Sequence, residues 1–267
     1  MKIIEQLCMG KRAGTPCEDG WVVTPHFAAV IDGSTAKIPL QPGEESPGHY
    51  AMRHVSGAIA MLPPDATKEE ALQQLTRAIG TRHPYASRRY RPTCSAVIYS
   101  RQRHEVWMIG DCQCRLQGRT FTNEKQVDRI LIDIRCRVVR HFLQNGYTPD
   151  DIRRDDKGRA FIYAALREQV HFQNDPNPHN PYRYSVIDGT PIDPDTVPCL
   201  TADGISEIIL ATDGYTELHD TLDDTERALR DMLREDPLCI GRNPSTKCLV
   251  EGNRSFDDRT YLRIALT

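Results

Sequence analysis

The chain has 267 residues, of which 39% are hydrophobic and 27% charged, and its 34 Lys and Arg against 37 Asp and Glu leave a net charge of -3. This length suits one large domain or two small ones and is sufficient to bury a core. The near-neutral charge argues against a nucleic-acid-binding protein, for which a basic domain is expected. It remains compatible with a phosphorylated substrate that meets a local basic patch.

The first residues and the cysteines indicate an intracellular protein. Glu5 interrupts the apolar run that a signal peptide needs, and no stretch approaches the ~18 consecutive apolar residues of a membrane span. Nine cysteines without an export signal are most simply reduced thiols, and an odd number cannot pair fully within one chain. We therefore expect a cytoplasmic protein that has neither a membrane nor a nucleic acid as its partner.

Runs rich in Val, Ile, Phe and Tyr predict strands, and apolar residues at intervals of three and four predict helices. In chain order the expected elements are strands at 21–24 and 27–31, helices at 52–62 and 67–79, strands at 95–99, 105–109 and 112–116, helices at 124–144 and 161–170, a strand at 205–211, a helix at 225–234 and a strand at 261–266. Prolines and glycines predict a loop at 38–48, and prolines and asparagines predict one at 174–181.

Local signals refine this outline. Thr67-Lys68-Glu69-Glu70 is a capping-box pattern at the start of a helix. The apolar face of the helix at 124–144 is expected to contain Val127, Ile130, Ile134, Val138 and Phe142. Adjacent strands joined by short polar turns favour antiparallel pairing over strict βαβ alternation, so the predicted class is α+β, with sheets packed against helical layers.

Acidic residues flank five of the expected strands. They are Glu18 and Asp19 before 21–24, Asp32 after 27–31, Asp111 after 105–109, Asp213 after 205–211, and Asp257 and Asp258 before 261–266. A single Asp-Gly pair such as Asp32-Gly33 is most often a turn. Several carboxylates that converge, however, repel one another unless a cation neutralises them, and oxygen ligands alone select hard ions such as Mg²⁺ or Mn²⁺.

The segments that carry these residues occur in a recognisable order. They are Glu18-Asp19, Val30-Ile31-Asp32-Gly33, Thr93-Cys94-Ser95-Ala96, Ile109-Gly110-Asp111, Leu210-Ala211-Thr212-Asp213-Gly214 and Asp257-Asp258-Arg259-Thr260. Over about residues 15–265 the chain resembles the metal-dependent protein phosphatases of the 2C type (the PPM family), as a divergent, bacterial-like member. The resemblance implies a four-layer α-β-β-α sandwich, with two mainly antiparallel sheets flanked by helix pairs. It also implies one domain over 1–267 with a helical and loop insert at about 120–200.

The resemblance further implies a site with two Mn²⁺ or Mg²⁺ ions and, as in bacterial-type members, a third. The implied ligands are Asp32 bridging two ions, the Gly33 carbonyl, Asp213 and Asp257 at the first ion, Glu18 or Asp19 at the second, and Asp111 at the third. The implied phosphate-binding group beside the catalytic Asp32 and Asp213 is Arg12 or Lys11. The implied activity is phosphomonoester hydrolysis by direct attack of a metal-bridging hydroxide. The implied enzyme is a protein serine/threonine phosphatase in signalling, with a phosphorylated protein or a small phosphorylated molecule as substrate.

The sequence also departs from the family pattern. Ser34-Thr35-Ala36-Lys37 stands where eukaryotic members have His-Gly-Gly, and Cys112 follows Asp111 where Ser is usual. The region 113–203 lacks the usual Thr-x-Asp-His stretch. Metal binding is compatible with these changes, while the substrate is left open between a protein and a small molecule.

Two alternative functions compete with this interpretation. The segment from Cys248 to Ser255 satisfies Cys-x5-Arg-Ser, the phosphate loop of cysteine phosphatases, with Cys248 as nucleophile and Arg254 as phosphate-binding group. Two residues argue against this site. Lys247 stands where His is usual, and Glu251 lies within the anion-binding loop. The non-enzyme alternative is a catalytically weak phosphatase-like module with a binding or regulatory role.

Three further patterns have structural interpretations. Asp188-Gly189 imitates the nucleophile motif of aspartyl phosphotransferases, but we interpret it as a turn. Strand alternation places Cys112 and Cys114 on one buried face, which favours a structural role over a soft-metal site. The basic run from Arg82 to Arg91 is expected to be a solvated connector.

Overall fold

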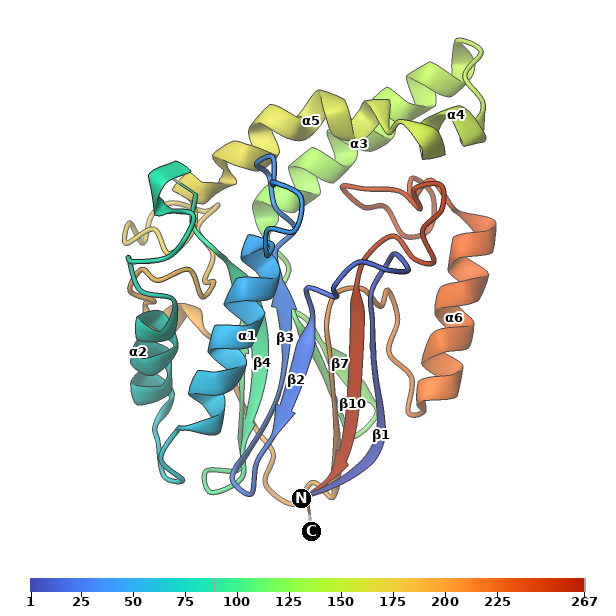
Figure 1. The fold of residues 1–267 in the computed structure, drawn as a ribbon. Helices are drawn as coiled ribbons and strands as arrows, with labels where there is room; N and C mark the ends of the chain where they lie inside the picture. The colour runs from blue at the N-terminus through green and yellow to red at the C-terminus, as the bar shows by residue number, and fades with distance from the viewer. Residues whose placement is uncertain (89, 267) are drawn as a thin grey trace.

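A computed structural model of the chain describes residues 1–88 and 90–266 and contains two five-stranded sheets (Figure 1). The first sheet has the order β2-β3-β4-β5-β8, with strands Gly20–Val23, Phe27–Gly33, Cys94–Ser100, Glu105–Ile109 and Cys199–Thr201. The second sheet has the order β1-β10-β9-β6-β7, with strands Lys2–Met9, Arg259–Ala265, Glu207–Ala211, Gln113–Leu116 and Arg119–Phe121. All the described strand pairs in both sheets are antiparallel. The predicted α+β class with two antiparallel sheets is confirmed.

The main core lies between the two sheets because side chains alternate between the faces of each strand. Ala28 and Val30 of β3 turn toward the second sheet, where they share a buried cluster with Leu210 of β9 and Leu262 of β10. The intervening Ile31 turns to the opposite face. The same alternation directs Asp32 toward the inter-sheet layer, at the end of β3.

Helices cover the outer faces of both sheets. Helices α1 (Pro47–Ala60) and α2 (Lys68–Ile79) pack Val55 and Leu75 on the outer face of the first sheet. The predicted capping box at Thr67 is present, with reciprocal hydrogen bonds between Thr67 and Glu70. Helix α6 (Leu222–Glu235) packs Leu229 against the outer face of the second sheet.

Helices α3 (Gln126–Gln144), α4 (Pro149–Arg154) and α5 (Lys157–Glu168) lie across one end of the sandwich, at the top of Figure 1. A buried arginine fixes them there. The Arg135 guanidinium of α3 forms an ion pair with Asp156 at 2.7 Å and donates hydrogen bonds to the carbonyls of Leu238, Cys239 and Ser245. Because these partners satisfy its charge and its donors, the arginine can remain buried.

The helix at 124–144 was predicted correctly, and its buried face was predicted in part: Val127 is buried, and Ile134 and Phe142 pack against buried clusters. The structure buries Val127, Leu131, Arg135, Cys136 and Val139, whereas Ile130 of the predicted face is 44% exposed. The reason is that α3 packs on α5 and on the loop after α6 through Arg135, a residue that an apolar pattern cannot select. Strands β1, β7 and β8 and helix α4 were not predicted.

Short 3₁₀ helices occupy three of the connections, Ala86–Arg88, Gln169–His171 and Pro194–Thr196. The first lies in the basic run 82–91, where Arg89 falls outside the described residues. This run is less solvated than predicted, because Tyr85 is buried and its hydroxyl donates to the Glu45 carbonyl at 2.7 Å. In the part of the chain that the structure describes, no helix has both the length and the apolar character needed to cross a membrane.

Candidate active site

The acidic residues gather at one end of the sandwich because antiparallel neighbours bring the end of one strand beside the start of the next. The Gly33 amide at the end of β3 donates to the Glu18 carbonyl, just before β2, at 3.1 Å. The Thr212 amide, just after β9, donates to the Thr260 carbonyl in β10 at 3.1 Å. Strand ends that are far apart in the sequence therefore lie together, at the end of the sandwich that α3 and α5 cover (Figure 1).

Asp32 and Asp213 form the centre of this group. Both carboxyl groups line the same cavity, and the charge of Asp213 acts on Asp32. Burial raises the pKa of Asp32 well above its usual value, and repulsion from Asp213 raises it further. Burial also raises the pKa of Asp213, whose Oδ1 is enclosed without a hydrogen-bond partner among the described residues. Both groups are thus held where a positive charge would relieve repulsion and desolvation.

Asp19 is buried next to this pair and is held by the opposite sheet. Its Oδ2 accepts a hydrogen bond from the Thr212 hydroxyl at 2.7 Å, and that hydroxyl accepts one from the Thr260 amide at 2.9 Å. Burial raises the pKa of Asp19 well above its usual value, and the charges of Asp258 and Asp213 add to the effect.

Asp111 is paired with a cation. Its Oδ1 accepts from the Ser95 hydroxyl at 2.6 Å, and its Oδ2 forms an ion pair with Lys125, just before α3, at 2.6 Å. Burial alone would raise the pKa of Asp111, but Lys125 and Ser95 lower it below its usual value. Asp111 therefore stays ionised.

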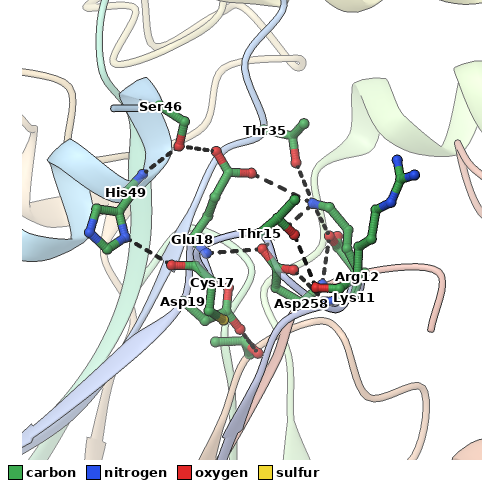
Figure 2. A network of polar contacts seen from close by, with 12 residues as sticks. Lys11, Arg12, Thr15, Cys17, Glu18, Asp19, Thr35, Ser46, His49 and Asp258 are labelled. Atoms are coloured by element: carbon green, nitrogen blue, oxygen red, sulfur yellow. Dashed lines mark hydrogen bonds and ion pairs between the residues drawn. The ribbon is translucent and has the colours of Figure 1, made fainter. Parts of the chain in front are cut away.

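Glu18, Asp257 and Asp258 surround the ammonium group of Lys11. Figure 2 shows Glu18 and Asp258 beside the Lys11 side chain. The Lys11 Nζ lies 3.2 Å from Asp257 and 3.6 Å from both Glu18 and Asp258. The other oxygen of Asp257 is in close contact with Lys247. Burial lowers the pKa of Lys247 to about 8, and the nearby charge of Lys11 contributes to this shift. Asp257 is therefore neutralised by two lysines.

The two glycines that follow Asp32 and Asp213 are required for close packing. A Cβ at Gly33 would lie 2.4 Å from the Gly48 carbonyl oxygen and 2.5 Å from that of Glu18. A Cβ at Gly214 would collide with the Asp258 carbonyl. Any side chain at either position would thus push apart the segments that carry the carboxylates.

The kind of donor in this group fits a hard divalent cation. Asp19 is buried and Asp32 and Asp213 are half-buried, all three are oxygen donors with raised pKa values, and the enclosed Asp213 Oδ1 is unpartnered in the described residues. Within residues 1–88 and 90–266, no three His, Cys, Asp or Glu side chains already stand at ligand spacing. Lysines contact Asp111 and Asp257, so Asp32 and Asp213, together with Asp19, are the residues that could hold an ion.

A cavity of about 120 Å³ opens beside Asp32 and Asp213, and its lining contains cations that the sequence did not single out. They are Lys37 from the segment after β3, Lys125, Arg159 from α5, and Lys247. Their positions depend on how the 120–200 region and the 240–247 loop pack over the strand ends. No local sequence pattern predicts that packing. Lys11, which the sequence offered as a phosphate-binding candidate, and Lys247 both contact Asp257.

Arg12, the other sequence candidate for phosphate binding, lies apart from this cavity. It is exposed, and in Figure 2 its guanidinium points away from the Glu18 and Asp258 carboxylates. The Lys11 side chain is directed toward them and donates to the Thr35 hydroxyl at 2.8 Å.

The surroundings of the Cys248 thiol argue against the alternative cysteine-phosphatase site. Cys248 is fully buried, and burial raises its pKa to about 12, so the thiolate that would attack phosphorus is disfavoured. Asp188 forms the predicted turn, with its Oδ1 accepting from the Thr190 amide at 2.9 Å. Cys112 and Cys114 are both buried, as expected for structural thiols.

No family model matches the chain, and no curated protein matches it. Among solved structures, the chain is similar to the Mycobacterium tuberculosis serine/threonine phosphatase PstP/Ppp, with a TM-score of 0.48, 14% identity and coverage of 97% of this chain and 96% of that one. It is also similar to the catalytic domain of PstP in complex with two manganese ions, with a TM-score of 0.47, 14% identity and coverage of 98% of both chains. A third similar structure is RsbX in complex with magnesium, with a TM-score of 0.46, 10% identity and coverage of 97% and 92%.

The two PstP structures are described as serine/threonine phosphatases. At such TM-scores and identities, the function of this chain has to be inferred from its own side chains.

Proposed function

We propose that the chain is a metal-dependent phosphomonoester hydrolase, and more specifically a protein serine/threonine phosphatase that uses Mn²⁺ or Mg²⁺. The observation that carries this proposal is the convergence of Asp32, Asp111, Asp213 and Asp257 on one cavity that also has cations in its lining. Such a site offers a cation its oxygen ligands and offers a phosphate its positive partners.

Each residue has a role that follows from its surroundings. Asp32 and Asp213 would bind the ion, because a divalent charge offsets the desolvation and repulsion that raise their pKa values. Thr212 keeps Asp19 oriented toward the pair, and Ser95 and Lys125 keep Asp111 ionised at the cavity wall. When bound, the ion supplies polarisation of a phosphoryl oxygen and makes water a stronger nucleophile near neutral pH.

The site favours direct transfer of phosphate to water. The buried Cys248 thiol, with its pKa raised to about 12, is unsuited to form a covalent phosphoenzyme. Asp32 and Asp213 are placed to serve as ion ligands. We therefore expect hydrolysis in one chemical step, without a phosphorylated protein intermediate.

Turnover of p-nitrophenyl phosphate by the purified chain, with and without Mn²⁺, tests the proposal. We expect activity that requires Mn²⁺, is abolished by chelation and by Asp213→Asn, and is nearly unchanged in the control Cys248→Ser. Activity that survives complete chelation would refute the metal-dependent reaction. Phosphoserine and phosphothreonine peptides, assayed beside small phosphate esters, then separate a protein phosphatase from a small-molecule phosphatase.

One observation favours a second candidate, a phosphatase-like binding module without turnover. Lys11 and Lys247 neutralise Asp257 with ammonium groups, which is how a site that has given up an ion would be stabilised. This alternative predicts that Mn²⁺ binds, as measured by isothermal titration calorimetry, while no phosphate ester is cleaved.

A further inference from the structure

Two cations on the cavity wall, Lys37 and Arg159, have no acidic partner within the described residues. Lys125 is paired with Asp111 and Lys247 with Asp257, but neither Lys37 nor Arg159 forms an ion pair with any carboxylate in the part of the chain that the structure describes. Among residues 1–88 and 90–266, the Lys37 ammonium has one side-chain hydrogen bond, to the Ser34 hydroxyl at 3.5 Å, which is at the limit for such a bond. The Arg159 Nη1 donates to the carbonyl and the hydroxyl of Thr246 at 3.0 and 3.4 Å, and the Nε and Nη2 donors of Arg159 form no hydrogen bond with the described residues.

The surroundings of both cations disfavour a bare positive charge. Burial lowers the pKa of Lys37 to about 8, and the charges of Lys125 and Arg159 lower it further. Burial also lowers the pKa of Arg159, against a smaller opposing effect of Asp156. A charge in such a place is costly unless a counterion reaches it, so the wall formed by Lys37 and Arg159 would be stabilised by an anion.

This wall faces the same cavity as Asp32 and Asp213. The hydroxyls of Ser34, Thr35 and Thr246 also line the cavity and can donate to an anion. Its volume of about 120 Å³ holds several water molecules, enough for the head of a phosphate ester. An anion held here would lie beside the carboxylates to which the divalent ion is assigned above.

We propose that Lys37 and Arg159 are the residues that hold the phosphoryl group of the substrate, and that helix α5 is thereby part of the substrate site. This inference deepens the proposed function and rests on it for the identity of the anion. The planar Arg159 guanidinium can bind two phosphoryl oxygens at once, and Lys37 adds a compact charge. Arg12 is exposed and directed away, and Lys11 is already surrounded by three carboxylates.

Calorimetric titration of the full chain with inorganic phosphate, in the presence of Mn²⁺, tests this assignment by measuring the affinity for phosphate. We expect Arg159→Ala and Lys37→Ala each to weaken phosphate binding at least tenfold, and Arg159→Lys to weaken it less than Arg159→Ala. The matched control is Arg167→Ala, because Arg167 is exposed on the same helix and should leave phosphate binding unchanged. Thermal unfolding of each variant, and its Mn²⁺ affinity, show whether the fold and the ion site are retained.

The inference would be overturned if Arg12→Ala weakened phosphate binding while Arg159→Ala and Lys37→Ala bound phosphate fully. That result would make Arg12 the phosphate-binding residue, as the sequence predicted. The outcome is separable from that of the proposed function. If the chain cleaves no phosphate ester but phosphate binding depends on Lys37 and Arg159, the hydrolase proposal fails and the anion site stands. If Mn²⁺-dependent cleavage occurs with unchanged kcat/KM in both variants, the hydrolase stands and this anion site is wrong.

Discussion

The Thr212 hydroxyl donates a hydrogen bond to Asp19 at 2.7 Å, although the two residues are 193 positions apart in the sequence. Thr212 follows β9 of the second sheet, and Asp19 precedes β2 of the first. This contact therefore joins the two sheets at the end where the carboxylates converge. It fixes one buried carboxylate relative to Asp213, the residue directly after Thr212.

Thr212→Val tests this contact, since the substitution keeps the shape of the side chain and removes the hydroxyl. It leaves Asp19 and the Thr260 amide without their buried partner, which should cost roughly 1–3 kcal/mol of the free energy of unfolding. We also expect weaker Mn²⁺ binding. The matched control is Thr201→Val on the exposed β8, and a melting temperature for Thr212→Val equal to that of the control would show that the contact contributes nothing.

The raised pKa of Asp32 gives the stability a defined dependence on pH. A carboxyl whose pKa is higher in the folded than in the unfolded state binds more protons when folded, so its contribution to stability falls as pH rises from about 4 toward the folded pKa. With EDTA present, Asp32→Asn should therefore be more stable than the wild type, by a margin that grows with pH over this range. Each unit of raised pKa corresponds to about 1.4 kcal/mol.

The measurement is thermal or denaturant unfolding of both proteins between pH 4 and 8. Mn²⁺ should stabilise the wild type and have little effect on Asp32→Asn. A wild type that is the more stable of the two across this range, without metal, would mean that Asp32 is not strained by burial and repulsion.

Lys247 should limit how many ions the site can hold. Because its ammonium contacts Asp257, a second ion has to displace it before Asp257 can serve as a ligand. Lys247→Met should raise the affinity for a second Mn²⁺ roughly tenfold or more, since a charge-assisted contact no longer competes. Calorimetry at pH 7 gives the stoichiometry, with Lys157→Met as control, because the Lys157 side chain is 40% exposed and is paired with Asp155 rather than with a residue of the site. Two tightly bound ions in the wild type would show that the lysine does not compete.

The sequence predicted which acidic residues lie at the ends of strands. Asp32, Asp111 and Asp213 could be identified because each follows an apolar run, and antiparallel pairing brings such ends together. The same antiparallel pairing places Asp32 opposite Ser95, and the Ser95 hydroxyl contacts Asp111. The strands and helices that bear strong apolar periodicity were likewise predicted close to their observed bounds.

What the sequence did not reveal is set by long-range packing. Lys125, Arg159 and Lys247 reach the cavity only because α3, α5 and the loop after α6 close over the strand ends through the buried Arg135. A lysine or arginine in a polar segment has the same local pattern whether it faces solvent or a cavity. Strand β1 was missed because half of its alternating residues are exposed, so that it carries no continuous apolar run.

Crystals soaked in Mn²⁺ and measured at the manganese absorption edge test most directly whether Asp19, Asp32 and Asp213 share an ion. We predict an anomalous difference peak bordered by the carboxylates of Asp32 and Asp213, absent from crystals of Asp213→Asn. A soaked wild-type crystal with no peak there, or with its strongest peak elsewhere, would contradict the account.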